Sequence, residues 1–427
     1  MTTMNRRDAL RMLGLSTLGA TALAACAPDA SGGGAPKGDT AAKTFGFTSW
    51  SLNEEAQKGA VQAIVDAYAT AKQVKVDTAS FPYNEYLNQV TLKLRGGQVS
   101  GAIQLDISWL GALAAMGKLR DLSPQAAKGG YTEVARSSGQ FDGKQLGLPW
   151  TTGSIGLIAN TDLLKKAGVD GLPSTVEEFE TALEKVGKLG GGVVPYAAAT
   201  KAAQLKDILP WMQTFGSPLL NGEEIAVGDD ASVAAVEWYK KLYDAKLIAP
   251  DVDRFDARAL FAQGKAAFYD DAIITRGVVS SQAPDKTLTE KMAPLARPVL
   301  KAGDTPRALL WGHVIVVVDG EGADAAADFA SFATSDTATV AGFFEKVKLP
   351  PTTTAGLADP KVAGDTFTTD WTEKITKTAT PNPFWRYAGY AQIESTIAEQ
   401  VQAVLVGQSS AKEALAKAAE TAKSLQK

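Results

Sequence analysis

The chain has 427 residues, of which 43 are Lys or Arg and 47 are Asp or Glu, so its formal net charge is −4 at pH 7. It lacks the basic excess that marks a nucleic-acid surface, and we do not expect nucleic acid as a partner. The single cysteine excludes an intramolecular disulfide, and the single histidine excludes a two-histidine metal motif. We therefore expect no metal and no cofactor. The length favours two domains over a single core.

The first 25 residues have the features of a bacterial lipoprotein signal peptide. A basic start with paired arginines precedes an apolar run at residues 12–25, and residues 23–26 read LAAC. The run is shorter than the ~20 residues that a membrane-spanning helix needs. We expect export by the Sec or twin-arginine route, cleavage before Cys26, and lipidation of Cys26 that anchors the extracytoplasmic chain to the cell membrane. Residues 26–43 would form a flexible linker.

Strands and helices alternate in the first part of the remaining chain. Residues 44–48 predict a strand, and apolar residues at helical spacing predict a helix over 61–68. A second strand at 74–77 and a second helix around 87–94 follow. This βαβ order indicates an α/β fold with a mostly parallel sheet and helices on its faces.

The same kind of pattern continues to the C-terminus. Ser174 and Glu177 have the spacing of a capping box, and a helix with an apolar stripe follows over 176–186. Residues 313–318 form a continuous apolar run, which is typical of a buried central strand. Apolar residues at helical spacing predict a helix over 390–404, and an Ala- and Lys-rich final helix follows it.

Several sequence motifs then occur in a specific order. They are LRDL at 119–122, GKQLGLP at 143–149 before GLIANTDLLKKAG at 156–168, FAQGKAAF at 261–268 and PFW at 383–385. In this order they resemble the extracellular solute-binding proteins (family 1) of ABC-type sugar importers, the group that includes maltose-binding protein. The resemblance runs over nearly the whole chain.

The resemblance implies a two-lobed fold of the periplasmic-binding-protein type (type II), with lobes that are discontinuous in sequence, a hinge and an interlobe cleft. We place lobe 1 at residues 44–150 plus 267–335, and lobe 2 at residues 151–266 plus 336–427. Such proteins close around a ligand like a hinge, because ligand contacts with both lobes shift the population toward the closed form. The resemblance also implies segments that cross between the lobes, the second of them near residues 266–269. Many sugar binders of the family carry a tryptophan just after this second crossing, where this chain has AII at residues 272–274.

The candidate ligand-binding residues follow from the chemistry of a sugar. A sugar ring presents a face of C–H groups and an edge of hydroxyls, so its site needs flat apolar surfaces and a few donors and acceptors. Five of the eight tryptophans stand at the ends of predicted elements, where ligands meet α/β sheets. The candidates are Trp50, Tyr83, Asn84, Trp109, Trp150, Asp271, Trp311, Trp385 and Arg386. For each tryptophan the alternative is core packing, which we expect for Trp211, Trp238 and Trp371.

The sequence thus predicts a binding protein that captures a mono- or oligosaccharide as a monomer and delivers it to the membrane permease subunits of an importer. The alternative is an enzyme, in its strongest form a secreted, lipid-anchored glycoside hydrolase, for which two carboxylates would suffice. A third reading, a lipoprotein that only scaffolds other proteins, gives no reason for aromatic residues at strand ends. His313 stands in a buried strand pattern, and we expect it to be a structural residue.

Overall fold

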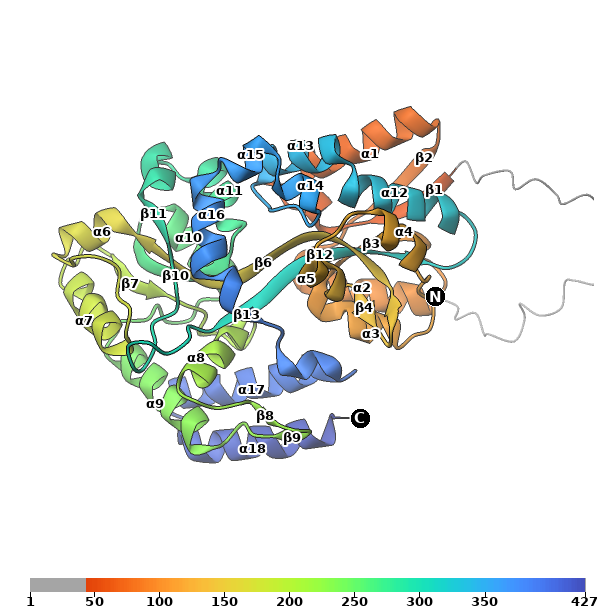
Figure 1. Ribbon diagram of the computed structural model, residues 1–427. Coiled ribbons are helices and arrows are strands. Elements are labelled where there is room, and N and C mark those ends of the chain that lie inside the picture. The colour runs from red at the N-terminus through yellow and green to blue at the C-terminus, as the bar shows by residue number, and fades with distance from the viewer. Residues whose placement is uncertain (1–43, 427) are drawn as a thin grey trace, which may run out of the picture. The chain divides into compact units, whose positions relative to one another are not determined.

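The computed structural model describes residues 44–426, which belong to one compact unit (Figure 1). The predictions for the signal peptide, for Cys26 and for the linker concern residues outside this range. The strands are β1 Thr44–Thr48, β2 Lys75–Ala79, β3 Gly101–Asp106, β4 Gln140–Phe141, β5 Lys144–Gln145, β6 Gly147–Asn160, β7 Val194–Ala197, β8 Leu220–Asn221, β9 Glu224–Ile225, β10 Ala266–Ala272, β11 Met292–Leu295, β12 Ala308–Val318 and β13 Ala379–Thr380.

Helices surround these strands. The α-helices are α1 Lys58–Lys72, α2 Tyr83–Arg95, α3 Leu110–Ala114, α4 Ser123–Lys128, α5 Glu133–Ser137, α6 Thr161–Lys166, α7 Val176–Gly187, α8 Ile208–Thr214, α9 Asp230–Asp244, α10 Arg254–Ala262, α11 Thr275–Gln282, α12 Ala323–Ser335, α13 Thr337–Val347, α14 Thr354–Leu357, α15 Pro360–Ala363, α16 Thr366–Lys374, α17 Tyr390–Leu405 and α18 Ala411–Ser424. Three 3₁₀ turns matter below: η1 Trp50–Asn53, η2 Ile107–Trp109 and η6 Pro383–Arg386.

A nine-stranded sheet organises the chain, with the strand order β2-β1-β3-β12-β6-β10-β7 and with β11 and β13 paired to β6 and β12. The first three strands are parallel, as are β7 and β10, whereas β12 runs antiparallel to both β3 and β6. The expectation of a mostly parallel sheet was therefore wrong. Figure 1 shows the reason: the long strands β6 and β12 pass side by side through the middle of the fold, and they pass through it in opposite directions.

Both faces of the sheet are buried. Along β12, Val314 and Val316 belong to one apolar cluster, while Ile315 and Val317 belong to a second cluster. This alternation follows from the two-residue period of a strand, and it explains why residues 313–318 read as one continuous apolar run. The prediction of a buried central strand is confirmed, although β12 begins at Ala308, five residues earlier than the apolar run.

The helical predictions are confirmed, with one shift in detail. Helices α1, α2, α7, α17 and α18 occupy the segments predicted from apolar spacing. The capping box of α7, however, is formed by Thr175 and Glu178 instead of Ser174 and Glu177. Both pairs have the required spacing, so the pattern did not distinguish them. The hydroxyl of Ser174 donates to Glu178 instead.

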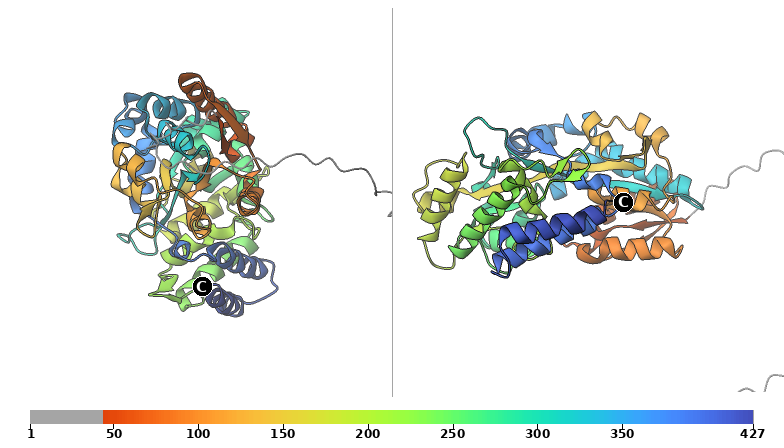
Figure 2. Two further views of the ribbon diagram at one scale, coloured as in Figure 1. Left: turned by 90° about the vertical axis from the view of Figure 1, so that its right-hand side faces the viewer. Right: turned by 90° about the horizontal axis from the view of Figure 1, so that it is seen from below.

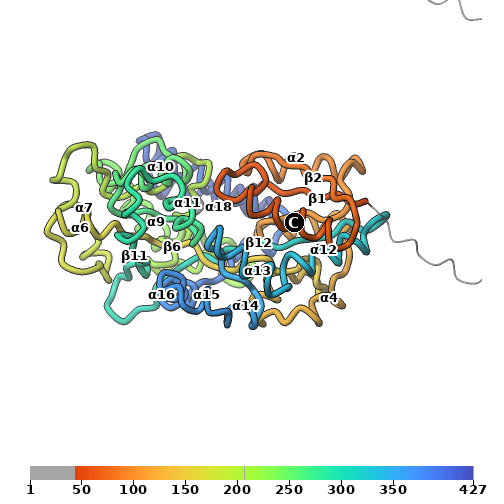
Figure 3. Tube along the Cα trace, turned by 90° about the horizontal axis from the view of Figure 1, so that it is seen from above, coloured from red at the N-terminus to blue at the C-terminus, as the bar shows by residue number. Residues whose placement is uncertain are grey.

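The helices after β12 extend along the fold. In Figure 3, α13, α14, α15 and α16 follow one another from beside α12 toward β11, and α16 packs against β11. The last two helices, α17 and α18, pack against each other and against α9, next to the C mark in Figure 2. Trp211, Trp238 and Trp371 are all buried, which confirms the prediction that they fill the core.

A buried ion pair joins β10 to the segment before β12. The carboxylate of Asp270 accepts a hydrogen bond of 2.6 Å from Nη2 of Arg297, and both side chains are at most 1% exposed. The guanidinium also lies over the ring of Trp211, 4.6 Å from its centroid, and Tyr196 donates to Asp270. Removing one partner of such a pair leaves a buried charge without compensation.

We therefore expect Arg297→Met to lower the free energy of unfolding by about 3–5 kcal/mol, because Asp270 would remain buried without its cation. Urea denaturation followed by tryptophan fluorescence measures this. The matched control is Lys377→Met, which breaks an ion pair with Glu373 whose side chains are 68% and 70% exposed and which should change stability little. Equal effects of the two substitutions would contradict the assigned role of the buried pair.

Candidate functional site

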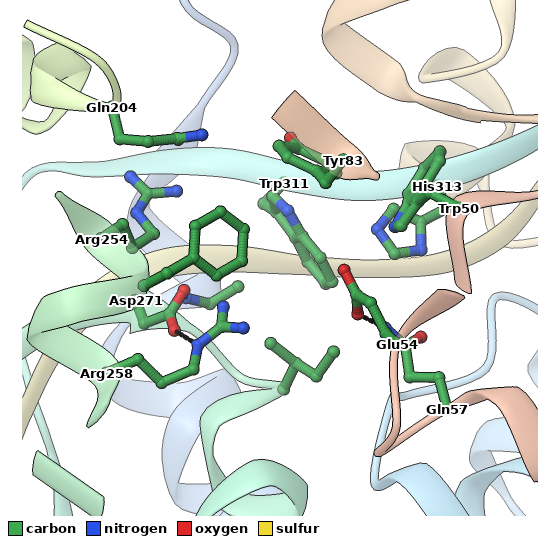
Figure 4. Close-up of a pocket in the computed structure, with 13 residues that line it drawn as sticks. Trp50, Glu54, Gln57, Tyr83, Gln204, Arg254, Arg258, Asp271, Trp311 and His313 are labelled. Atoms are coloured by element: carbon green, nitrogen blue, oxygen red, sulfur yellow. Dashed lines mark hydrogen bonds and ion pairs between the residues drawn. The ribbon is translucent and has the colours of Figure 1, made fainter. Parts of the chain in front are cut away.

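A cavity lies between the half of the sheet that contains β1 to β3 and the half that contains β7 and β10. Its volume is about 40 Å³, far below the ~300–1,000 Å³ usual for small-molecule sites, so a ligand would fit only after the two sides move apart. Side chains from both halves line it (Figure 4). The lining residues are Trp50, Glu54, Gln57, Tyr83, Gln204, Arg254, Phe255, Arg258, Asp271, Ala272, Ile274, Trp311 and His313. We call this space the central cavity.

An aromatic cluster forms one wall of the central cavity. Trp50, which begins η1 after β1, contacts the rings of Tyr83, Trp109 and His313 at centroid distances of 5.5, 5.4 and 4.8 Å. Trp311 on β12 extends the cluster through His313, at 4.5 Å. Four predicted site residues thus meet in one cluster. Edge-to-face packing fixes the ring orientations and presents apolar surface to the cavity.

His313 holds this cluster together as a neutral ring. Its side chain is buried, and its Nδ1 lies 3.2 Å from Nε2 of Gln104. Burial lowers the pKa of His313 to about 4, and the nearby carboxylate of Asp106 offsets only part of that effect. The prediction of a buried structural histidine is confirmed, and the structure adds that this residue also lines the cavity.

Helix α10 supplies the opposite wall. Arg254 and Arg258 are one turn apart on this helix and both line the cavity. Each is neutralised by an aspartate: Arg254 pairs with buried Asp207, and Nε of Arg258 donates to Asp271 at 2.7 Å. Phe255 lies between them and places its ring 6.2 Å from that of Tyr83. The aromatic wall and the arginine wall therefore touch.

Asp271 is fully committed to protein partners. Its carboxylate accepts hydrogen bonds from Arg258, Tyr269, Thr275 and the backbone N–H of Ala272. Burial alone would raise its pKa, but the charges of Arg258 and Arg254 and these hydrogen bonds outweigh burial and lower the pKa of Asp271 below its ordinary value. Asp271 is thus ionised and holds Arg258 against the cavity wall.

A side-chain bridge connects the two walls at one edge of the cavity. Nε2 of Gln204 donates to Oδ1 of Asn84 at 3.1 Å. Gln204 has a φ of 71°, in the left-handed region that glutamine rarely occupies. Tyr83 and Gln204 also line a second cavity, together with Asn84 and Trp109. The two cavities therefore adjoin at Tyr83 and Gln204.

Three of the predicted ligand-binding residues line neither of the two cavities. Trp150, within β6, is buried and stacks on Phe343 at 5.0 Å. Trp385 in η6 is half-buried against the core, and exposed Arg386 lies near the ring of Tyr387. None of the three lines the central cavity or its neighbour. The expectation that Trp150 and Trp311 stand at element ends was wrong, because both long strands continue through these positions.

Sequence reasoning missed five polar lining residues. They are Glu54, Gln57, Gln204, Arg254 and Arg258. The two arginines carried a usable signal, since they stand four residues apart on a helix shortly before a strand with two aspartates. The other three have no local pattern that separates them from surface residues.

The chain belongs to the family of bacterial extracellular solute-binding proteins, whose family model matches residues 63–372. This membership makes it a binding protein and not an enzyme, as predicted. Among curated proteins, the diacetylchitobiose-binding protein DasA of Streptomyces coelicolor is 22% identical over 278 residues, which are 62% of this chain and 63% of DasA. The chain thus spans less than two thirds of the length of this relative.

Solved structures show the fold. The GacH receptor of Streptomyces glaucescens, solved unliganded and with acarbose, superposes with a TM-score of 0.81 at 22% identity over 90% of this chain and 98% of GacH. A tagatose-bound solute-binding protein of Thermotoga lettingae gives 0.81 at 20% identity, covering 90% and 100%. Maltose-bound MalE3 of T. maritima gives 0.78 at 20% identity, covering 90% and 99%. The predicted two-lobed α/β fold of periplasmic binding proteins is confirmed.

The sole histidine of the chain permits a direct test of the aromatic wall. We expect its imidazole proton resonance to titrate near pH 4 in the folded protein, well below the ordinary 6.5, because burial disfavours the charged ring. The unfolded chain takes up this proton at higher pH, so protonation of His313 costs stability as the pH falls from about 6.5 to 4. A titration midpoint near 6.5 by NMR would show that the ring is open to solvent.

Proposed function

We propose that the protein captures a carbohydrate in the central cavity and delivers it to the permease subunits of an ABC-type importer. The observation that carries this proposal is the composition of the cavity. Aromatic rings form one wall, and polar groups already fixed by hydrogen bonds and ion pairs form the other. These are the two surfaces that the C–H face and the hydroxyl edge of a sugar require. The ligands of GacH, MalE3 and DasA support the same class.

The proposal includes closure about a hinge. The cavity draws its lining from η1, α2 and β12 on one side and from α10 and β10 on the other. A ligand in this space would contact both sides, and only differential contacts of this kind can shift the balance between open and closed forms. The predicted lobe bounds, 44–150 plus 267–335 and 151–266 plus 336–427, group β10 with α2 and β12, so the hinge division proposed here departs from them at β10.

The direct test is a calorimetric screen of the purified chain against neutral mono- and disaccharides, with product analysis of the same samples. Binding without turnover is the expected result, together with a smaller radius of gyration by small-angle scattering when a binder is present. Hydrolysis of a bound sugar would contradict the proposal and support the alternative of a glycoside hydrolase. The family and the related structures give no support for that alternative. An unchanged radius would contradict hinge closure.

A matched pair of substitutions separates binding from core packing. Trp311 and Trp238 are 8% and 7% exposed, but only Trp311 lines the central cavity. We expect Trp311→Leu to weaken carbohydrate binding by ~2 kcal/mol or more, because large aromatic side chains dominate such contacts. Trp238→Leu should lower the melting temperature without changing the dissociation constant. Unchanged affinity in Trp311→Leu would remove this residue from the site.

We also propose that the chain acts outside the cytoplasm as a monomer, tethered to the cell membrane through a lipidated Cys26. The basis is the LAAC sequence at residues 23–26. Within residues 44–426 no helix combines the length and the apolar character that crossing a membrane requires.

Replacement of Cys26 by serine tests the anchor. Lipidation supplies ~0.8 kcal/mol of membrane affinity for each buried methylene, so its loss should release the protein from the membrane fraction or leave an uncleaved precursor. Fractionation with metabolic labelling by a radioactive fatty acid measures this. The labelled wild type is the control, and a Cys26→Ser protein that still carries the label would contradict the assignment.

A further inference from the structure

The central cavity contains an acidic side chain that lacks an ionic partner. Of its four charged lining residues, Arg254 is paired with Asp207, and Arg258 is paired with Asp271. The fourth is Glu54, which follows η1 and is half-buried. Within residues 44–426 its carboxylate forms no ion pair, and the one hydrogen bond that this carboxylate accepts comes from the uncharged side-chain amide of Gln57.

Burial is not compensated at this carboxyl group. It raises the pKa of Glu54, and the charge of Arg258 and the hydrogen bond from Gln57 offset only part of the rise. Arg258 cannot serve fully as its counterion, because the Nε of that guanidinium donates to Asp271. A half-buried carboxylate in this position gains most from a ligand that brings its own positive charge.

The aromatic wall favours the same kind of ligand. Figure 4 shows Glu54 pointing into the space beside Trp311, with Arg258 and Asp271 across the cavity. Trp50 and Tyr83 line the same space. The faces of aromatic rings attract cations, and a carboxylate next to such faces completes a site for an ammonium group.

We propose that the central cavity selects a carbohydrate that carries a protonated amine over the corresponding neutral and acidic sugars, and that Glu54 binds the ammonium group. This inference rests on the proposed function and specifies its substrate class. The arginines do not favour acidic sugars, because their aspartates already neutralise them and would be left without partners if an anion displaced them. An acidic ligand would also face the unpaired charge of Glu54.

The test compares sugars that differ only in charge. Calorimetry at pH 7 would use glucose, glucosamine and glucuronic acid, the same three forms of galactose, and the pair cellobiose and chitobiose. In at least one set the amine should bind roughly 10-fold or more tightly than the neutral sugar, as expected for a hydrogen bond to a charged group, and the acid should bind most weakly. Equal or tighter binding of the neutral or acidic sugar would overturn the inference.

Glu54→Gln identifies the residue responsible, and Glu55→Gln is its matched control. Both remove one negative charge at neighbouring positions, but the side chain of Glu55 is 80% exposed and pairs with Lys58. Glu54→Gln should reduce the preference for the amine over the neutral sugar at least 10-fold, whereas Glu55→Gln should leave both this preference and neutral binding unchanged. Equal losses for amine and neutral sugar would show that Glu54 only accepts hydroxyl groups. If no sugar in any set binds, the proposed function itself fails.

Discussion

The antiparallel pairing of β6 with β12 is the constraint on which the site depends. These strands bring Trp311 opposite Gly153, and β10 in turn brings Asp271 opposite Gly156 of β6. Glycine in a strand permits close approach of neighbouring groups. At Gly312 a Cβ atom would come within 2.5 Å of the carbonyl oxygen of Thr151, so the approach of the two strands itself requires a residue without a side chain.

Strand β10 contributes both to stability and to the site because its neighbouring side chains point to opposite faces of the sheet. Asp270 points away from the central cavity and pairs with fully buried Arg297, whereas Asp271 pairs with Arg258 on the cavity wall. The period of two in a strand determines this division. As a result β10, which carries Asp271 to the cavity wall, is fixed by the buried ion pair between Asp270 and Arg297. The position of Asp271 is therefore set before a ligand binds.

The sequence was informative where the signal is local. Apolar spacing located the main helices, and the reasoning that sugar sites need aromatic surfaces selected Trp50, Tyr83 and Trp311, which the structure brings to one cavity. The prediction of a mostly parallel sheet was wrong because strand direction depends on the path of the chain through the fold, and no local sequence pattern indicates that path. The core packing of Trp150 could not be predicted for the same reason, because its stacking partner Phe343 is distant in sequence.

Electrostatic pairing explains why, apart from Asp271, the polar residues of the site were not predictable. A carboxylate is visible in the sequence, but its counterion is not: Arg297 follows Asp270 by 27 residues, and Asp207 precedes Arg254 by 47. Only the fold decides which charges are cancelled. Two arginines on one face of α10 would suggest an anion site if read alone. With both of them paired, Glu54 is the charged residue of the cavity lining that has no ion pair within residues 44–426, and this is the basis of the proposed preference for a cationic sugar.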